Sequence, residues 1–412
     1  MLDRYNSIGI ILAGGGAKGA YQAGANDFLR AQNALQKMRM VAGTSIGSWN
    51  ALFWLAGMLE EENGQMCGLE HWWSTLSFLG LVRPKFYIPC VRNYFLSASP
   101  WRKSFKRLFA DRPATADRLK QHIERPDAEG SIHFYLTRSN VERASLEVTT
   151  NRNLDAVTSN LPTAKWKSGV HRVIGDRAKT IDDLRDAVFS SMDLPPLFKY
   201  WKIGDYFYED GGVIDNLPIQ FGTESEQCDL LFILPLNATF SQDVNHRSII
   251  KRLFRVMDVR QGVLERNSFK MVYLYNELAA LREKTEKLES LAQRAFEALA
   301  TPANAAAMDL VGELQHALPS LAKADGLSQE ASPVDRALVR RHRRLQVFAI
   351  CPAPKLAINT VEFWKRAEAG KAFRLMRGAT ARELESFFCD PPEYVRMPLV
   401  QPHGDVVYLE EF

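Results

Sequence analysis

The fold is decided by IGIILAGGGAKGAYQAGANDFLRAQNALQKMRMVAGTSIGSWN, which is residues 8–50. The apolar run Ile8–Leu12 ends at three glycines, which is typical of a buried strand that leads into a tight loop. The pattern then predicts a helix over residues 17–35, a second buried strand over residues 38–42 and a second helix over residues 48–59. This order of strands and helices indicates an α/β fold.

Ser45 is the candidate nucleophile. It is the central residue of Gly43-Thr44-Ser45-Ile46-Gly47, a G-x-S-x-G sequence between the second strand and the second helix. The glycines Gly43 and Gly47 allow a tight turn that exposes the serine oxygen. Two helix N-termini converge near this residue, and their unpaired N–H groups suit an oxyanion. The pentapeptide alone also fits a structural turn, but the strand before it and the helix after it favour a nucleophile.

Three motifs in this order resemble the patatin-like phospholipases, a family of serine acyl hydrolases. They are GGGAKGAYQAG at residues 14–24, GTSIGS at residues 43–48 and SSMDLPPLFKYWKIGDYFYEDGG at residues 190–212. The resemblance implies a three-layer α/β/α sandwich with a mainly parallel central sheet. It also implies a Ser–Asp dyad without histidine, in which Asp210 of the Asp-Gly-Gly turn, supported by Gly211 and Gly212, is the partner of the serine.

The chemistry of the two residues fits such a dyad. A serine hydroxyl needs a base within hydrogen-bonding distance. A carboxylate with the ordinary pKa of about 4 is a weak base, but desolvation beside Ser45 would make Asp210 a useful one. The alternative for Asp210 is a residue that only stabilises a turn.

The glycine-rich loop is expected to form the oxyanion hole, with Lys18 at a position where many family members carry arginine. Lys18 could instead be a surface lysine with its ammonium in water. The residues assigned to the oxyanion hole are Gly14, Gly15, Gly16, Ala17 and Lys18.

Composition excludes several classes of protein. The 412 residues are 46% hydrophobic and carry a net charge of +4 without a one-sided basic stripe, so we expect no nucleic-acid partner. The five cysteines are few and odd in number, so we predict neither a disulfide framework nor a metal site. We also predict no cofactor. No signal peptide and no transmembrane run of 18 apolar residues are found. We therefore expect a cytoplasmic protein. The family resemblance implies that it acts on a lipid or membrane-surface ester, which is compatible with peripheral attachment to a membrane.

The chain is predicted to form one catalytic domain over residues 1–378, with a helical insertion at about 245–344 and a tail over 379–412. The strand pattern LQVFAI at residues 345–350 is expected to rejoin the same sheet after the insertion. Residues 79–105 are irregular, aromatic and basic. They are either a lid or acyl-chain wall over Ser45 that touches the membrane surface, or an ordinary packed connection.

The same glycine and serine motifs partly fit other classes of protein. Gly14, Gly16 and Gly19 satisfy G-x-G-x-x-G, but the second strand does not end in the acidic residue that a dinucleotide site requires. Ser45 follows only two strands, too early for a Ser-acid-His α/β-hydrolase. The sequence therefore favours a serine acyl hydrolase of the phospholipase A or lysophospholipase type. The alternatives are a general carboxylesterase on the same dyad and a non-enzymatic interaction scaffold.

Overall fold

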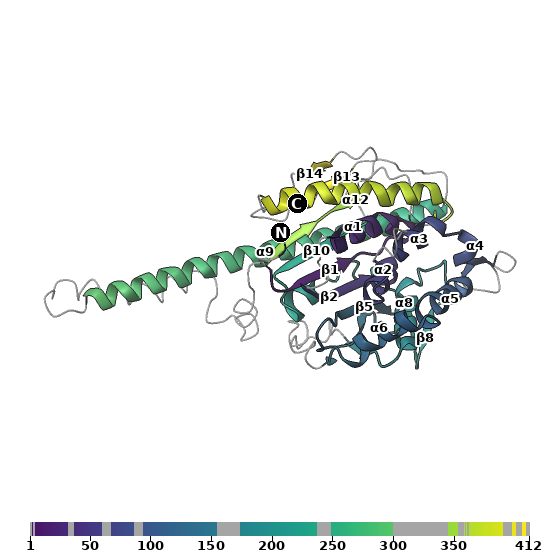
Figure 1. Cartoon of the computed structure of the whole chain (residues 1–412), viewed down its shortest axis with the longest axis horizontal. Coiled ribbons are helices and arrows are strands. Elements are labelled where there is room, and N and C mark those ends of the chain that lie inside the picture. The colour runs from purple at the N-terminus through teal and green to yellow at the C-terminus, as the bar shows by residue number, and fades with distance from the viewer. Residues whose placement is uncertain are drawn as a thin grey trace. The chain divides into compact units, whose positions relative to one another are not determined.

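A nine-stranded sheet forms the centre of the fold (Figure 1). Its main path is β11-β10-β1-β2-β5-β6-β7, and β9 pairs with both β5 and β8. The pairs from β11 to β5 are parallel, whereas β5 is antiparallel to β6 and to β9. The strands are β1 (Ile8–Leu12), β2 (Met38–Thr44), β5 (His133–Asn140), β6 (Ser145–Thr150), β7 (Ile174–Arg177), β8 (Trp201–Ile203), β9 (Tyr206–Asp210), β10 (Leu230–Leu234) and β11 (Gln346–Ala349).

Helices flank this sheet, and α1 and α12 lie side by side (Figure 1). The helices are α1 (Gly19–Ala31), α2 (Ile46–Leu55), α3 (Gly68–Thr75), α4 (Phe78–Leu81), α5 (Ser99–Phe105), α6 (Pro113–Glu124), α8 (Ile181–Met192), α9 (Ile249–Leu299) and α12 (Arg366–Cys389). Short strands form two small separate sheets: β3 (Arg83–Pro84) with β4 (Leu96–Ser97), and β12 (Cys351–Pro352) with β13 (Pro398–Val400) and β14 (Val406–Tyr408).

The computed structural model describes residues 2, 5–31, 37–59, 67–85, 94–154, 174–236, 249–299, 345–352, 358, 360, 362–389, 398–400 and 406–408. The chain divides into two compact units. One unit comprises Met1–Lys270 and Leu345–Phe412, and the other is Met271–Arg344. Residues 245–248 and 300–344 of the predicted helical insertion lie outside the described residues, and the predicted domain boundaries stay predictions.

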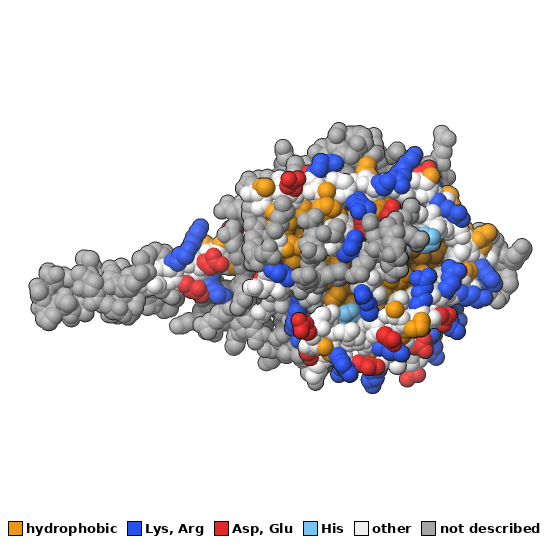
Figure 2. Space-filling view, viewed as in Figure 1, with side chains coloured by type: hydrophobic (Ala, Val, Ile, Leu, Met, Phe, Trp, Pro, Cys, Tyr) orange, Lys and Arg blue, Asp and Glu red, His pale blue; other side chains and the backbone are white. Residues whose placement is uncertain are grey.

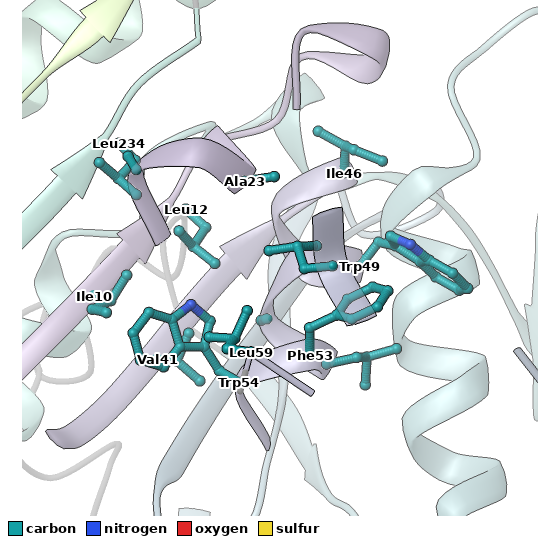
Figure 3. Packing of buried hydrophobic residues seen from close by; sticks show 14 of the residues in the cluster. Ile10, Leu12, Ala23, Val41, Ile46, Trp49, Phe53, Trp54, Leu59 and Leu234 are labelled. Atoms are coloured by element: carbon teal, nitrogen blue, oxygen red, sulfur yellow. The ribbon is translucent and has the colours of Figure 1, made fainter. Parts of the chain in front are cut away.

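The core packs on one face of the central strands. Alternate residues of β1, Ile10 and Leu12, point to this face because side chains alternate along a strand. They join Trp49 and Phe53 of α2 in one buried cluster (Figure 3). Trp49 also contacts Trp101 of α5, with ring centroids 5.3 Å apart. The helix that follows the candidate nucleophile is therefore fixed by apolar packing with β1 and by aromatic packing with α5.

The structure confirms the predicted α/β fold with a mainly parallel sheet. The strands at Ile8–Leu12 and Gln346–Ala349 belong to the same sheet, as expected. From the sequence alone, residues 360–377 and 381–388 are expected to form two separate helices, but the structure has one continuous helix, Arg366–Cys389. Glycine inside a helix costs about 1 kcal/mol. Here a continuous buried stripe that includes Phe373, Met376 and Leu384 carries the helix through Gly378.

Candidate active site

The turn after β2 holds Ser45 in the predicted position. Ser45 lies at the N-terminus of α2 with φ 54° and ψ −126°, a strained conformation for a residue other than glycine. The turn requires glycine on both sides. A Cβ on Gly47 would lie 2.1 Å from the carbonyl oxygen of Leu12, and one on Gly43 would lie 2.7 Å from the carbonyl carbon of Gly47. The helix can therefore begin directly against the strands, two residues earlier than the sequence predicted.

Asp210 lies beside this serine. The β8–β9 hairpin delivers it, and β9 is anchored on β5 through the pair Arg138 and Asp210. Ser45 Oγ donates a hydrogen bond to Asp210 Oδ2 at 2.5 Å. The other carboxylate oxygen, Oδ1, accepts the backbone N–H of Gly212 at 2.8 Å. The structure thus brings together the two side chains that the sequence motifs singled out 165 positions apart.

Burial makes this carboxyl a better base than an exposed one. Ser45 is 8% exposed and Asp210 is 2% exposed. Burial raises the pKa of Asp210 to about 7, although the hydrogen bonds from Ser45 and Gly212 lower it in part. A carboxyl with this pKa is about half ionised at neutral pH, and it can both take and return a proton there.

Hydrogen bonds fix the glycine loop, and they determine which of its backbone N–H groups remain available to a ligand. The Gly14 N–H donates to Asn216 Oδ1 at 3.0 Å, and Asn216 Nδ2 donates to the Gly14 carbonyl at 3.2 Å. The Ala17 N–H donates to the Thr360 carbonyl at 2.8 Å, and the Lys18 N–H to the Gly15 carbonyl at 3.3 Å.

These bonds correct the oxyanion assignment in part. In this structure the amides of Gly14, Ala17 and Lys18 are already occupied, so we no longer assign them as oxyanion donors. Within the described part of the chain, the amides of Gly15, Gly16 and Ile46 have no acceptor. The loop needs glycine at position 16, where φ is +58° and a Cβ would lie 2.1 Å from the Thr360 carbonyl oxygen.

Lys18 is buried rather than solvated, so its interpretation as a surface lysine was wrong. It is 7% exposed, and its Nζ lies 3.5 Å from Asp258 Oδ1 of α9. A second residue of α9, Glu265, accepts a hydrogen bond from Asn216 Nδ2. The first half of α9 therefore braces both the glycine loop and the turn after Asp210. No motif in the sequence pointed to these two acidic residues.

Two further polar residues near the dyad were missed. The Ser45 N–H donates to Ser191 Oγ at 2.7 Å, and this hydroxyl also lies 3.0 Å from Ser48 Oγ. The Asp210 N–H donates to the backbone carbonyl of Asp193 at 3.1 Å. Burial raises the pKa of the Asp193 carboxyl well above its usual range. Both residues lie in the motif over residues 190–212, and this motif is the sequence signal that could have identified them.

No histidine among the described residues contacts the dyad. His122 Nδ1 accepts the Ile132 N–H at 3.0 Å, and burial lowers the pKa of His122 to about 4. His133 pairs with Glu226 at the start of β5. Nor does the described part of the chain contain a group of three His, Cys, Asp or Glu side chains that could hold a metal ion.

Comparison with known families agrees with this geometry. The family model described as patatin-like phospholipase matches residues 10–221, which is 212 of the 412 residues. The chain belongs to the patatin-like phospholipase family. The matched region includes the glycine loop, Ser45 and the Asp-Gly-Gly turn. Membership of this family implies acyl hydrolase activity.

Other comparisons add less. Among solved structures, VipD from Legionella pneumophila matches with 13% sequence identity and a TM-score of 0.30. The match covers 61% of this chain and 52% of that chain, so it spans about half the length of VipD. No curated protein matched the sequence. None of the helices in the described ranges is long and apolar enough to cross a membrane.

Proposed function

We propose that this patatin-like chain is a serine hydrolase of lipid acyl esters, with Ser45 as nucleophile and Asp210 as general base. The observation that carries the proposal is the 2.5 Å hydrogen bond from Ser45 Oγ to a buried carboxylate whose pKa is about 7. At neutral pH, this carboxylate is poised to take the serine proton without a histidine.

The proposed cycle needs only these residues and water. Ser45 Oγ attacks the ester carbonyl carbon while its proton passes to Asp210, and the N–H groups of Gly15, Gly16 and Ile46 bind the developing oxyanion. The carbon–oxygen bond to the alcohol breaks, and the alcohol leaves with the proton from Asp210. Water then attacks the acyl-enzyme and gives a proton to Asp210. The fatty acid is released, and the proton returns to Ser45.

The substrate class rests on the family, and an activity panel tests it. Purified protein is assayed on the butyrate, octanoate and palmitate esters of p-nitrophenol and on phosphatidylcholine vesicles, with released fatty acid measured by mass spectrometry. We expect Ser45→Ala and Asp210→Asn to lower the rate by at least about 10³-fold. Asp205→Asn is the matched control because Asp205 lies exposed in the turn of the same hairpin.

The outcomes separate the alternatives. Long-chain and vesicle substrates cleaved faster than the short ester support a lipid acyl hydrolase. Preference for the soluble butyrate ester, with no response to vesicles, would support a general carboxylesterase on the same dyad. A folded protein that cleaves none of these esters would contradict the proposal and favour an interaction scaffold.

A further inference from the structure

One surface of the molecule carries large apolar side chains in water. Leu79 on α4 is 69% exposed, Trp364 before α12 is 54% exposed, and Phe95 before β4 is 40% exposed. Exposed apolar residues are normal when single, but a group of large ones marks an interaction site. We call these three residues, with the basic residues named below, the apolar–basic face.

Contacts between elements place Leu79 and Trp364 on one connected part of the surface, and the Lys85 N–H after β3 donates to the Phe95 carbonyl at 2.8 Å. The ring of Phe78, next to Leu79, lies edge-on to Trp364 with centroids 5.6 Å apart. Phe363 contacts Trp101 of α5 at 5.8 Å, and α4 contacts α5 directly. Segments that are far apart in the sequence are thus held together by buried aromatic rings, while Leu79 and Trp364 remain exposed.

The same part of the surface is basic. Its exposed cationic side chains include Arg83, Lys103, Lys106 and Arg107, and none of these four has an ion-pair partner among the described residues. Residues 76–85 and 94–110 contain no Asp or Glu. Figure 2 shows blue side chains gathered over the end of the molecule where Figure 1 places α4 and α5. The nearby acidic residue Glu362 is paired with Lys365 at 2.8 Å.

This face adjoins the elements that hold the dyad. Trp101 of α5 packs on Trp49 of α2, the helix that begins at Ser45. The Thr360 carbonyl, four residues before Trp364, accepts the Ala17 N–H of the glycine loop. The elements that carry the apolar–basic face are therefore in direct contact with those that hold the candidate active site.

We propose that the apolar–basic face docks this chain on an anionic lipid surface. The proposal rests on the lipid substrate of the proposed function and adds the means by which the chain would reach it. Tryptophan and leucine enter the interfacial layer of a bilayer, and lysine and arginine beside them contact acidic head groups. With these four unpaired cations and no acidic residue within 76–85 or 94–110, this face is complementary to a negatively charged surface and unsuited to a neutral soluble partner.

The experiment measures vesicle binding separately from catalysis. Co-sedimentation uses the full chain carrying Ser45→Ala, which prevents hydrolysis, with phosphatidylcholine vesicles that contain or lack phosphatidylglycerol. We expect tight binding only to the anionic vesicles, weakened by added salt. The pair Lys103→Ser and Lys106→Ser should weaken binding about 25-fold, because each basic residue near an anionic surface contributes about fivefold. The pair Leu79→Ser and Trp364→Ser should weaken it at least tenfold.

A matched control carries Arg177→Ser and Lys179→Ser. These exposed residues both precede α8. The start of this helix lies about 18 Å along its axis from its other end at Met192, so the two substitutions should leave binding unchanged. Labelling of Ser45 by a fluorophosphonate, in chains with the native serine, tests the dyad independently of vesicles.

Three results would overturn the docking proposal. In the first, the variants of the apolar–basic face bind vesicles as tightly as the parent chain does. In the second, the parent chain binds neutral and anionic vesicles equally. In the third, it binds no vesicles at low salt. The last would leave an acidic protein as the partner for this face. Vesicle binding without fluorophosphonate labelling would instead count against the proposed function and leave the docking surface supported.

Discussion

Replacing the buried carboxylate of Asp210 should make the protein more stable while it abolishes activity. The pKa of this group is about 7 in the fold, compared with about 3.9 for an aspartate in an unfolded chain. Between those two values the folded state binds more protons than the unfolded state, so this group's contribution to stability falls as pH rises. At about 1.4 kcal/mol per pH unit, the raised pKa of Asp210 lowers the free energy of unfolding by about 4 kcal/mol at pH 8 and by about 2 kcal/mol at pH 5.5.

Asp210→Asn removes that charge and keeps a side chain of the same shape. Its amide oxygen can still accept the Gly212 N–H, and its NH₂ can donate to Ser45 Oγ. The variant should therefore unfold with a free energy higher than that of wild type, and the gap should widen by about 2 kcal/mol between pH 5.5 and pH 8.

Urea unfolding followed by tryptophan fluorescence measures this gap at both pH values. Asp215, another buried carboxyl with a raised pKa, affects wild type and variant alike and cancels in the difference, whereas the Asp210 charge contributes to the raised pKa of Asp193. The exposed Asp205→Asn should show no gap at either pH. A variant less stable than wild type at pH 8, or a gap that does not change with pH, would refute the reasoning.

Three further predictions concern the site and its support. First, kcat/KM on a soluble ester should fall about tenfold per pH unit below about pH 7, because only ionised Asp210 accepts the serine proton; a profile that is flat from pH 5 to 8 would contradict this. Second, Gly14→Ala should lower activity at least about a hundredfold, because its Cβ would lie 2.5 Å from Asn216 Oδ1 and 2.8 Å from Ser45 Cβ. Wild-type rates in this variant would show that the loop position is unimportant. Third, Glu226→Gln should destabilise the fold by about 3 kcal/mol in urea unfolding, because it breaks a buried charged cluster. Fluorophosphonate labelling of the folded variant should be unchanged, and its loss would mean that the two ends of the sheet are coupled.

The cluster around Glu226 lies at the opposite end of β5 from the dyad. His133 Nδ1 lies 2.8 Å from Glu226 Oε1, and Tyr135 also donates to this carboxylate. Burial alone would raise the pKa of Glu226, but the hydrogen bonds and charges of these partners lower it. Its stabilising contribution is thus present at neutral pH and lost as pH falls through the acidic range.

The parts of the site that the sequence predicted are those encoded by local pattern. Apolar runs that end in glycine predicted the strands before the loop and before Ser45, and the Asp-Gly-Gly turn marked Asp210. The cap of α8 is equally local, because the Thr180 side chain accepts the Asp183 N–H at 3.1 Å. In each case the residues that form the structure are neighbours in the chain.

The parts that were missed depend on contacts between distant segments. Nothing in the sequence around Lys18 shows that Asp258, 240 positions later, will pair with it. Likewise, the choice of free amides in the glycine loop depends on Asn216 and on the Thr360 carbonyl. A glycine motif indicates that N–H groups are accessible to a ligand, but only the fold shows which of them are already bonded.

Fluorophosphonate labelling tests the central claim most directly, because the probe reacts only with an activated serine. Wild type, Ser45→Ala, Asp210→Asn and the control Asp205→Asn are compared at pH 8 with circular dichroism as a check of folding. The account predicts labelling of wild type and of the control, none in Ser45→Ala, and a sharp loss in Asp210→Asn. Folded wild type that stays unlabelled, or full labelling of Asp210→Asn, would contradict a Ser45–Asp210 dyad.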